Sequence, residues 1–180
     1  MTNFFFGFLI SNHNSIKDKL NLHRLNYISY SIVIVTLLSV LTGCDKQTVF
    51  EQNQKIKDRS WSENNTLVFN VNIKDTVSFY NMYINTRNAD TYRFSNLYIF
   101  MTTTLPQGQI EKDTLQLVLA NDEGKWLGSG LGDIFECRIL FKEKFHFINS
   151  GNYQFKLQQA MRLNPLPGIL DVGLRIEKAK

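Results

Sequence analysis

The feature that most constrains the fold is an alternation of apolar and polar residues that begins near Thr66 and recurs along the chain. Successive side chains of a β-strand point to opposite faces, so a period of two predicts half-buried strands. The alternation is clearest in four segments: 67–73, 135–141, 153–158 and 170–177. After residue 50 no stretch keeps the 3.6-residue period of an amphipathic helix, and only 158–162 has the composition of a helical turn.

Further strands are predicted from β-branched and aromatic composition, with polar turns between them. These strands are expected at 77–86, 94–104, 115–119 and from Phe145 onward, with loops at 87–90 and 121–133. Many short strands joined by turns are typical of an all-β protein. We therefore expect residues 66–180 to form an antiparallel β-sandwich, either immunoglobulin-like or jelly-roll-like. Its last strand, 170–176, should bury one face in the core.

A second feature precedes this domain. The uncharged apolar run 27–41 ends in Leu41-Thr42-Gly43-Cys44, and a polar segment follows. Small residues before a cysteine are typical of a bacterial lipoprotein signal peptide. The pattern predicts such a signal peptide, with a long n-region, at residues 1–43 and a lipid on Cys44. A transmembrane helix is the alternative, but the run of about 15 residues is shorter than the ~20 that a span requires.

Residues 44–65 are predicted to be the lipidated cysteine and a polar tether. The segment 45–65 is rich in charged and amide side chains. Fully extended, it would reach ~70 Å at about 3.3 Å per residue. Phe50 and Trp61 are expected to dock on the domain. The lipid on Cys44 would hold the protein on a membrane without spanning it.

Charge and cysteine content argue against nucleic-acid binding and against a nucleophilic cysteine. The net charge is +4, but three of the 20 basic residues and one of the 16 acidic residues fall in residues 1–44, which leaves +2 after signal removal. This small excess is no evidence for nucleic-acid binding. With Cys44 acylated, Cys137 has no intramolecular disulfide partner. It lies on the apolar side of a predicted strand, which indicates a buried, inert thiol rather than a nucleophile.

The sequence contains no strong catalytic or metal-binding motif. The glycine-rich stretch 124–132 lacks the Gly-Lys-Ser/Thr end and following helix of a phosphate-binding loop. His146 is the one histidine after the signal peptide, so a metal site or a Ser-His-Asp set lacks partners. We predict no catalytic residue, no metal, no cofactor and no small-molecule ligand. A carboxylate-based hydrolase stays open, since any two acids can meet in space. The acids that flank the glycine-rich stretch match no calcium-loop spacing and are better explained as solvated: Asp122, Glu123, Asp133 and Glu136.

The aromatic residues allow two interpretations. More are present than one sheet face requires: Tyr80, Tyr83, Tyr92, Tyr98 and Trp126. The favoured interpretation is that both faces of a sandwich absorb them. The other is an exposed surface that docks a protein or stacks on sugars. A glycan-binding module would require Tyr92 and Trp126 to be exposed in a groove.

A set of motifs spans essentially the whole mature part; the last two are distinctive, whereas the first is shared by all lipoproteins. They are L-T-G-C at 41–44, Trp61, Arg87 with Tyr92, Asn96-Leu97-Tyr98, Asp113-Thr114-Leu115, G-K-W-L-G-S-G-L-G-D at 124–133, Gly151 with Tyr153, Q-A-M-R at 159–162 and L-P-G-I-L-D-V-G-L-R-I-E at 166–177. In these motifs the chain resembles the GldH family of gliding-motility lipoproteins of the Bacteroidetes.

The resemblance implies an outer-membrane lipoprotein of the cell envelope that works in the gliding machinery and the protein-secretion apparatus that overlaps with it. It implies no catalytic residue, cofactor or metal. The expected function is therefore docking of other proteins of that complex. Candidate docking residues among the motifs are Arg87, Tyr92, Trp126 and Arg162. A cell-surface glycan-binding sandwich is the alternative function.

Overall fold

A computed structural model describes residues 47–180, apart from the side chain of Leu131. The predicted signal peptide at 1–43 and the lipid site at Cys44 lie outside this range. Within it, no helix has both the length and the apolarity needed to cross a membrane.

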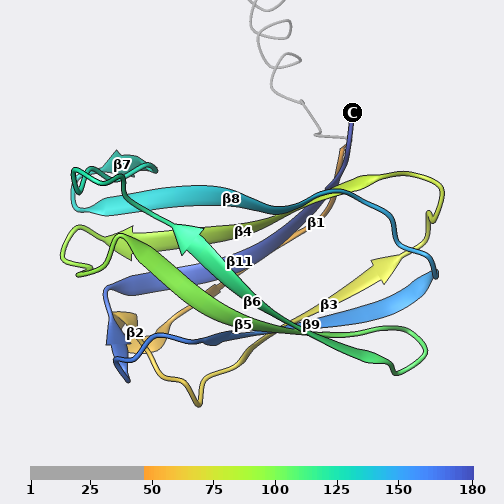
Figure 1. The fold of residues 1–180 in the computed structure, drawn as a ribbon, viewed down its shortest axis with the longest axis horizontal. Helices are drawn as coiled ribbons and strands as arrows, with labels where there is room; N and C mark the ends of the chain where they lie inside the picture. Colours follow the sequence, from red (N-terminus) through yellow and green to blue (C-terminus); the bar gives the residue numbers. More distant parts are fainter. Residues whose placement is uncertain (1–46) are drawn as a thin grey trace, which may run out of the picture. The chain divides into compact units, whose positions relative to one another are not determined.

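The described part is built from two large antiparallel sheets and one two-stranded sheet (Figure 1). The first sheet has the strand order β1 (Thr48–Lys55), β11 (Ile169–Lys178), β4 (Tyr80–Ala89), β8 (Ile134–Phe145) and β7 (Ser129–Leu131). The second has the order β3 (Leu67–Ile73), β9 (Gly151–Gln159), β5 (Asn96–Thr104) and β6 (Ile110–Val118). The 3-10 turn η1 (Lys57–Arg59) precedes β2 (Ser60–Trp61), which pairs with β10 (Leu166–Pro167).

The eight long strands form nested antiparallel pairs. The outermost pair is β1 with β11, then β3 with β9, β4 with β8, and β5 with β6 at the centre. Two further pairings, β11 with β4 and β5 with β9, complete the sheets. A long hairpin folded over in this way is the jelly-roll arrangement. The structure confirms the predicted antiparallel sandwich and identifies which of the two expected types it is.

The core lies between the sheets and is filled by the inward side chains of the alternating strands. On β3 every second residue from Leu67 to Ile73 is buried, and β9 and β5 show the same pattern. Burying one large apolar side chain stabilises a fold by roughly 1.5–3 kcal/mol. The largest fully buried side chains include Trp61, Tyr80, Phe69, Phe147 and Phe155.

The predicted tether is wrong for residues 48–61, because 48–55 and 60–61 form strands and Ile56 between them is buried. β1 pairs with β11 over most of its length, and Trp61 is fully buried with its Nε1 donating to the Asn65 carbonyl at 2.8 Å. Phe50 packs against the core, as expected. An edge strand can carry polar residues on its inward side, because it buries little surface. β1 has Gln52 and Gln54 there. It therefore lacks the apolar alternation that predicts a strand.

Several predicted boundaries also need correction. β4 continues through Arg87 to Ala89, where a loop was expected, because it pairs there with both neighbours. The expected loop 121–133 contains the short strand β7. Phe145 ends β8 rather than starting a new strand, and its ring packs edge to face on Phe147 at 4.9 Å. No helical turn forms at 158–162, where β9 ends.

The last long strand is buried on both faces, not on one. Its inward residues Val172, Leu174 and Ile176 are fully buried, as predicted. The opposite side is covered as well, and Asp171 and Arg175 are only 5% and 7% exposed. β11 lies between β1 and β4, so side chains from both neighbours fold over it.

Candidate functional site

The candidate site is the outer face of the first sheet, where the register of four strands places twelve residues in three rows. We call this surface the polar face. Its rows run across β1, β11, β4 and β8: Glu51, Arg175, Tyr83 and Leu140; Asn53, Gly173, Asn85 and Arg138; Lys55, Asp171, Arg87 and Glu136. Side chains on alternate positions of paired strands are neighbours, so each row is a line of contacts across the sheet.

Glu51 joins three strands of the polar face through one carboxylate. It accepts hydrogen bonds from Arg175 on β11, from Asn85 Nδ2 on β4 at 2.8 Å, and from Arg138 Nη2 on β8 at 3.2 Å. Burial opposes ionisation of this carboxyl group, but the hydrogen bonds from Arg175 and Asn85 outweigh it and hold the pKa of Glu51 below its usual value. The carboxylate is therefore charged and fixed in place.

Arg175 is the buried centre of this network. Besides Glu51, its guanidinium contacts Glu177, with Nε 2.9 Å and Nη2 2.8 Å from Oε2. The other oxygen of Glu177 accepts from the Tyr83 hydroxyl at 2.9 Å. Burial, together with this bond to Glu177, raises the pKa of Tyr83. Charge-assisted bonds of this kind are stronger and more directional than neutral ones.

Gly173 leaves a gap in the middle row that Asn53 fills. A Cβ placed on Gly173 would lie 1.7 Å from Asn53 Oδ1 and 2.6 Å from the Gln52 carbonyl oxygen. Asn85 adds an Nδ2 contact to Asn53 at 3.4 Å and accepts from Arg138 Nε at 3.2 Å. The side chain of Asn53 and the backbone of Gln52 thus both approach Gly173 closely.

In the third row, Arg87 Nε lies 2.6 Å from Asp171 Oδ2. The Asp171 side chain is 7% exposed, while that of Arg87 is 41% exposed. The row therefore has a buried acid beneath a guanidinium that still reaches solvent. Arg138 in the middle row is similarly accessible, with 47% of its side chain exposed. Chemically, the polar face offers fixed hydrogen-bond donors and acceptors on a rigid sheet.

The four predicted docking residues differ in how accessible they are. Arg87 belongs to the polar face, and Arg162 is exposed on the segment between β9 and β10. Tyr92 is only 4% exposed, with its hydroxyl donating to the Asn96 carbonyl at 2.9 Å, and burial raises its pKa. Its Cβ lies 3.1 Å from the position of a Cβ built on Gly168, so the glycine makes room for the buried ring. Tyr92 is thus a core residue and not an accessible one.

Trp126 is half-buried in an aromatic cluster with Tyr92. Its ring centroid is 6.3 Å from that of Tyr92 and 5.6 Å from that of Phe135.

Gly128 allows the same loop to pack closely, since a Cβ there would lie 2.4 Å from the Glu136 carbonyl oxygen and 2.6 Å from Cys137 Sγ. Cys137 is buried, and its burial raises the pKa of the thiol. Within residues 47–180, no three His, Cys, Asp or Glu side chains gather as a metal site would require.

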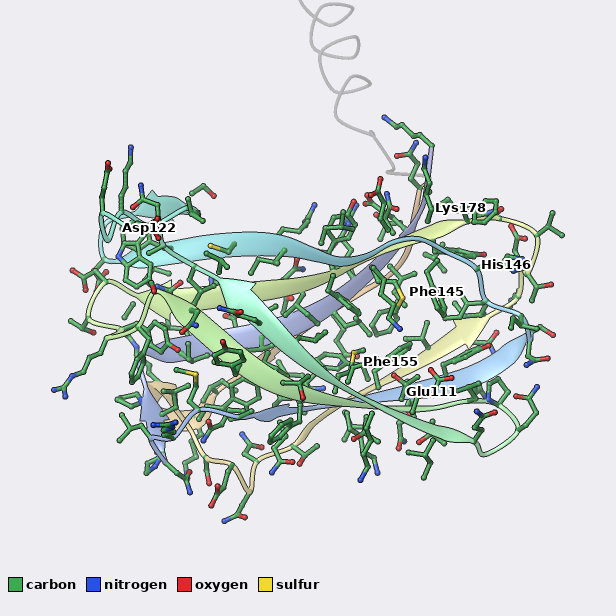
Figure 2. The ribbon with its side chains drawn as sticks, viewed as in Figure 1. Glu111, Asp122, Phe145, His146, Phe155 and Lys178 are labelled. Carbon is green, nitrogen blue, oxygen red and sulfur yellow. The ribbon has the colours of Figure 1, made fainter. Side chains whose placement is uncertain are left out.

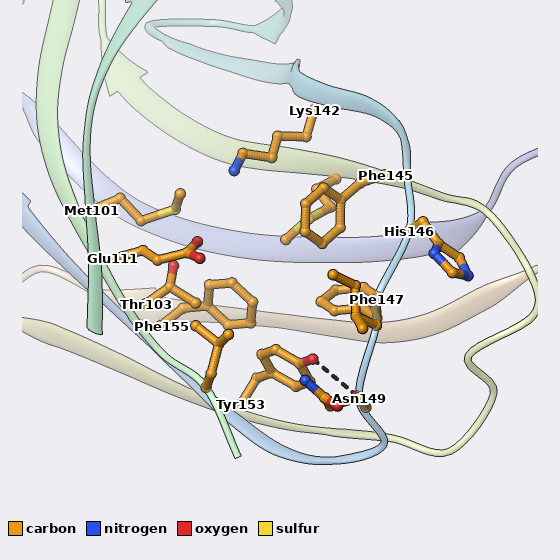
Figure 3. Close-up of a pocket in the computed structure, with 13 residues that line it drawn as sticks. Met101, Thr103, Glu111, Lys142, Phe145, His146, Phe147, Asn149, Tyr153 and Phe155 are labelled. Atoms are coloured by element: carbon orange, nitrogen blue, oxygen red, sulfur yellow. Dashed lines mark hydrogen bonds between the residues drawn. The ribbon is translucent and has the colours of Figure 1, made fainter. Parts of the chain in front are cut away.

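A cavity between the sheets is the second feature of interest (Figure 3). Its volume is about 190 Å³, and its wall includes Met82, Met101, Phe145, Phe147, Tyr153 and Phe155. Lys142 lies beside it, with Nζ 3.5 Å from Asp113 and 5.0 Å from the Phe145 ring centroid. Sites for small molecules usually measure ~300–1,000 Å³, so this cavity is small for such a ligand.

Sequence reasoning missed the polar face as a unit. Part of the signal was present, since polar residues alternate with apolar ones in 135–139 and 170–176. Alternation alone, however, indicates only that these positions face away from the core. The register decides which of them meet, and the register depends on long-range pairing of β1 with β11 and of β4 with β8.

Comparison with known proteins gives a consistent result. The family model described as "GldH lipoprotein" matches residues 48–176, a range that begins at the first residue of β1 and includes the whole polar face. A protein of Christiangramia forsetii named "Gliding motility lipoprotein GldH homolog" is 37% identical over 158 residues, covering 84% of this chain and 96% of that protein. The "Gliding motility lipoprotein GldH" of Flavobacterium johnsoniae is 31% identical, with 84% and 98% covered.

Among solved structures, a 4-O-methyl-α-glucuronidase overlaps 76% of this chain and 18% of its own, with a TM-score of 0.38 and 9% sequence identity. An overlap this weak carries no information on activity.

Proposed function

Because the chain belongs to the GldH lipoprotein family, we propose that it is an accessory lipoprotein that docks another protein of the gliding-motility machinery on its polar face. The family is one of gliding-motility lipoproteins and not a known family of enzymes. The proposal extends to the protein-secretion apparatus that overlaps with that machinery. It places the protein at the outer membrane, held by a lipid on Cys44.

The observation that carries the docking role is the network centred on Glu51 and Arg175. Its side chains are held by bonds among themselves, so a partner would not have to order them on binding, and that lowers the entropic cost of association. Arginine is enriched among the residues that dominate interface energies. Arg87 and Arg138 present such groups to solvent from fixed positions.

The anchoring part of the proposal rests on the signal sequence. Two or three acyl chains hold a protein far more firmly than one, because each buried CH2 contributes about 0.8 kcal/mol. Replacing Cys44 with serine removes the thiol that accepts the lipid. Metabolic labelling with an alkyne palmitate analogue should then fail to tag the variant, and a tagged variant would contradict the anchor.

The glycan-binding alternative is weaker in this structure. It needs Tyr92 and Trp126 to be exposed together in a groove, so that sugar rings can stack on them. Tyr92 is buried and Trp126 is half-buried against it. One of the two stacking rings is therefore inaccessible.

The docking role can be tested by complementing a deletion strain of a gliding species. The wild-type chain should restore colony spreading, whereas Arg138→Glu should restore little, because it reverses an exposed charge of the polar face. Lys125→Glu is the matched control, as it reverses an exposed charge in the glycine-rich loop. Full complementation by Arg138→Glu, or motility and secretion untouched by the deletion itself, would contradict the proposal.

A further inference from the structure

One end of the sandwich combines the start of the described chain with two exposed loops. The backbone N–H of Lys178 donates to the Gln47 carbonyl at 2.9 Å, and that of Ala179 donates to the Phe79 carbonyl at 2.8 Å. The point where the chain enters β1 is therefore next to the loop 74–79 that connects β3 to β4. Figure 2 shows Lys178 and His146 towards this end and Asp122 at the opposite end.

This end carries large apolar side chains in solvent. Val77 is 85% exposed, Phe79 55% and Ile148 80%. The loop 74–79 and the loop that holds Ile148 are joined by contacts of His146, whose Nε2 lies 2.6 Å from the Thr76 carbonyl oxygen and whose ring centroid is 5.6 Å from that of Phe79. The three apolar residues thus lie on two connected loops at this end of the sandwich, and we call them the apolar tip.

Internal bonds fix the conformation of the loop 74–79. Both carboxylate oxygens of Asp75 are used: Oδ1 accepts from the N–H groups of Val77 and Ser78 at 2.9 and 3.1 Å, and Oδ2 accepts from Ser78 Oγ at 2.6 Å and Lys178 Nζ at 2.5 Å. Val77 and Phe79 are thus held in their exposed positions by a hydrogen-bonded turn, which the bond from Lys178 connects to β11. A rigid loop that holds apolar side chains in water indicates a surface that something covers.

The short separation between Cys44 and Gln47 identifies what covers the apolar tip. Gln47 is the third residue after Cys44, so the two are separated by at most ~11 Å of extended chain. A lipid on Cys44 would hold Gln47, and the apolar tip beside it, at the membrane surface. Lys74 and Lys144 are exposed at this same end, where they suit anionic headgroups.

We propose that the apolar tip rests on the lipid bilayer, with Val77, Phe79 and Ile148 entering the interfacial region. The inference depends on the lipid on Cys44 that the proposed function includes. It also fixes an orientation. β4 starts beside the tip at Tyr80 and runs ten residues, at ~3.3 Å each, to its far end at Ala89. The polar face then stands upright from the membrane, with Arg87 towards its outer end.

The test uses the full lipidated protein reconstituted in phosphatidylethanolamine–phosphatidylglycerol vesicles. Val77→Cys is labelled with an environment-sensitive fluorophore, and Ile148→Cys provides a second position on the tip. Leu127→Cys is the control, since Leu127 is 60% exposed but lies in the glycine-rich loop at the other end. The unsubstituted protein reports background labelling of the buried Cys137.

Nitroxide-bearing lipids should quench the fluorophore at residues 77 and 148 several-fold more strongly than at 127. Equal quenching at all three positions in protein that floats with the vesicles would overturn the membrane contact and leave the anchor standing. Protein that does not float, and whose N-terminal peptide lacks the mass of a lipid, would overturn the anchor and the membrane contact with it.

Discussion

Arg175 on β11 donates to the carboxylate of Glu51 on β1, although the two residues lie 124 positions apart in the sequence. This contact ties the first long strand to the last one and holds the side chains of the polar face in register. The stability of the sandwich and the order of its proposed docking surface therefore depend on the same residues.

Replacing Arg87 with alanine should destabilise the fold by about 1–3 kcal/mol, because it removes the guanidinium that pairs with the buried Asp171 carboxylate. Urea unfolding would measure the change in the free energy of unfolding. Arg138→Ala is the control, since its ion pair with Glu51 is more exposed and should cost no more than about 1 kcal/mol. A smaller loss for Arg87→Ala than for Arg138→Ala would show that burial of Asp171 does not set the cost.

Adding one methyl group at Gly173 should destabilise the domain by about 1–3 kcal/mol through overpacking. The new Cβ in Gly173→Ala would meet Asn53 Oδ1 and the Gln52 carbonyl oxygen. The double variant with Asn53→Gly should recover only part of the loss, because the backbone oxygen of Gln52 stays in place. Thermal unfolding of the three proteins measures this, and a neutral Gly173→Ala would be inconsistent with the close approach of β1.

Acid should weaken the fold partly through Glu51. Its pKa is lower in the folded protein than its usual value of 4.5. A lowered folded-state pKa contributes stability that is present above 4.5 and is lost as the pH falls towards the folded-state value. In Glu51→Gln, the free energy of unfolding should therefore fall less steeply below pH 4.5 than in the wild type.

Glu51 is not the one group that contributes to acid sensitivity. The pKa of Asp75 is also lowered, and the largest cause is its hydrogen bond to Lys178, so some acid sensitivity will persist in Glu51→Gln. Glu123→Gln, at an exposed loop acid, provides the control and should keep the wild-type slope. Identical slopes for Glu51→Gln and the wild type would mean that the network does not stabilise the ionised carboxylate.

Truncation should show that the last strand is integral to the sandwich. A chain that ends at Asn164 lacks β11, which lies between β1 and β4 and buries Val172, Leu174 and Ile176. Losing three such side chains, at roughly 1.5–3 kcal/mol each, rivals the net stability of a typical domain. A chain that ends at Glu177 should stay folded. Cooperative melting of the shorter chain near the wild-type temperature would contradict this role of β11.

The sequence predicted strands where one side of the strand is apolar and the other is polar. β3 and β9 alternate because they bury one side chain in two in the core, and residue type reports this directly. β1 has Gln52 and Gln54 where apolar residues were required for the same inference. As an edge strand it is held by its ladder to β11, and pairing with a distant strand leaves no local signal.

The site was less predictable than the fold for the same reason. Arg87 was a candidate from its motif, whereas Glu51, Arg138 and Arg175 lie on three different strands, and only the register places them side by side. Tyr92 was a candidate docking residue from its motif, yet Gly168 gives its ring a buried position that depends on the approach of a segment far along the chain.

The most direct test of the docking role is photo-cross-linking in cells that produce the full lipoprotein. A photoreactive phenylalanine analogue replaces Leu140, which is 43% exposed on the polar face, or Phe100, which is 50% exposed on the outer side of the second sheet. We expect illumination to give a covalent adduct with another envelope protein from position 140 and none from position 100. An adduct from position 100 alone, or from neither position, would contradict docking on the polar face.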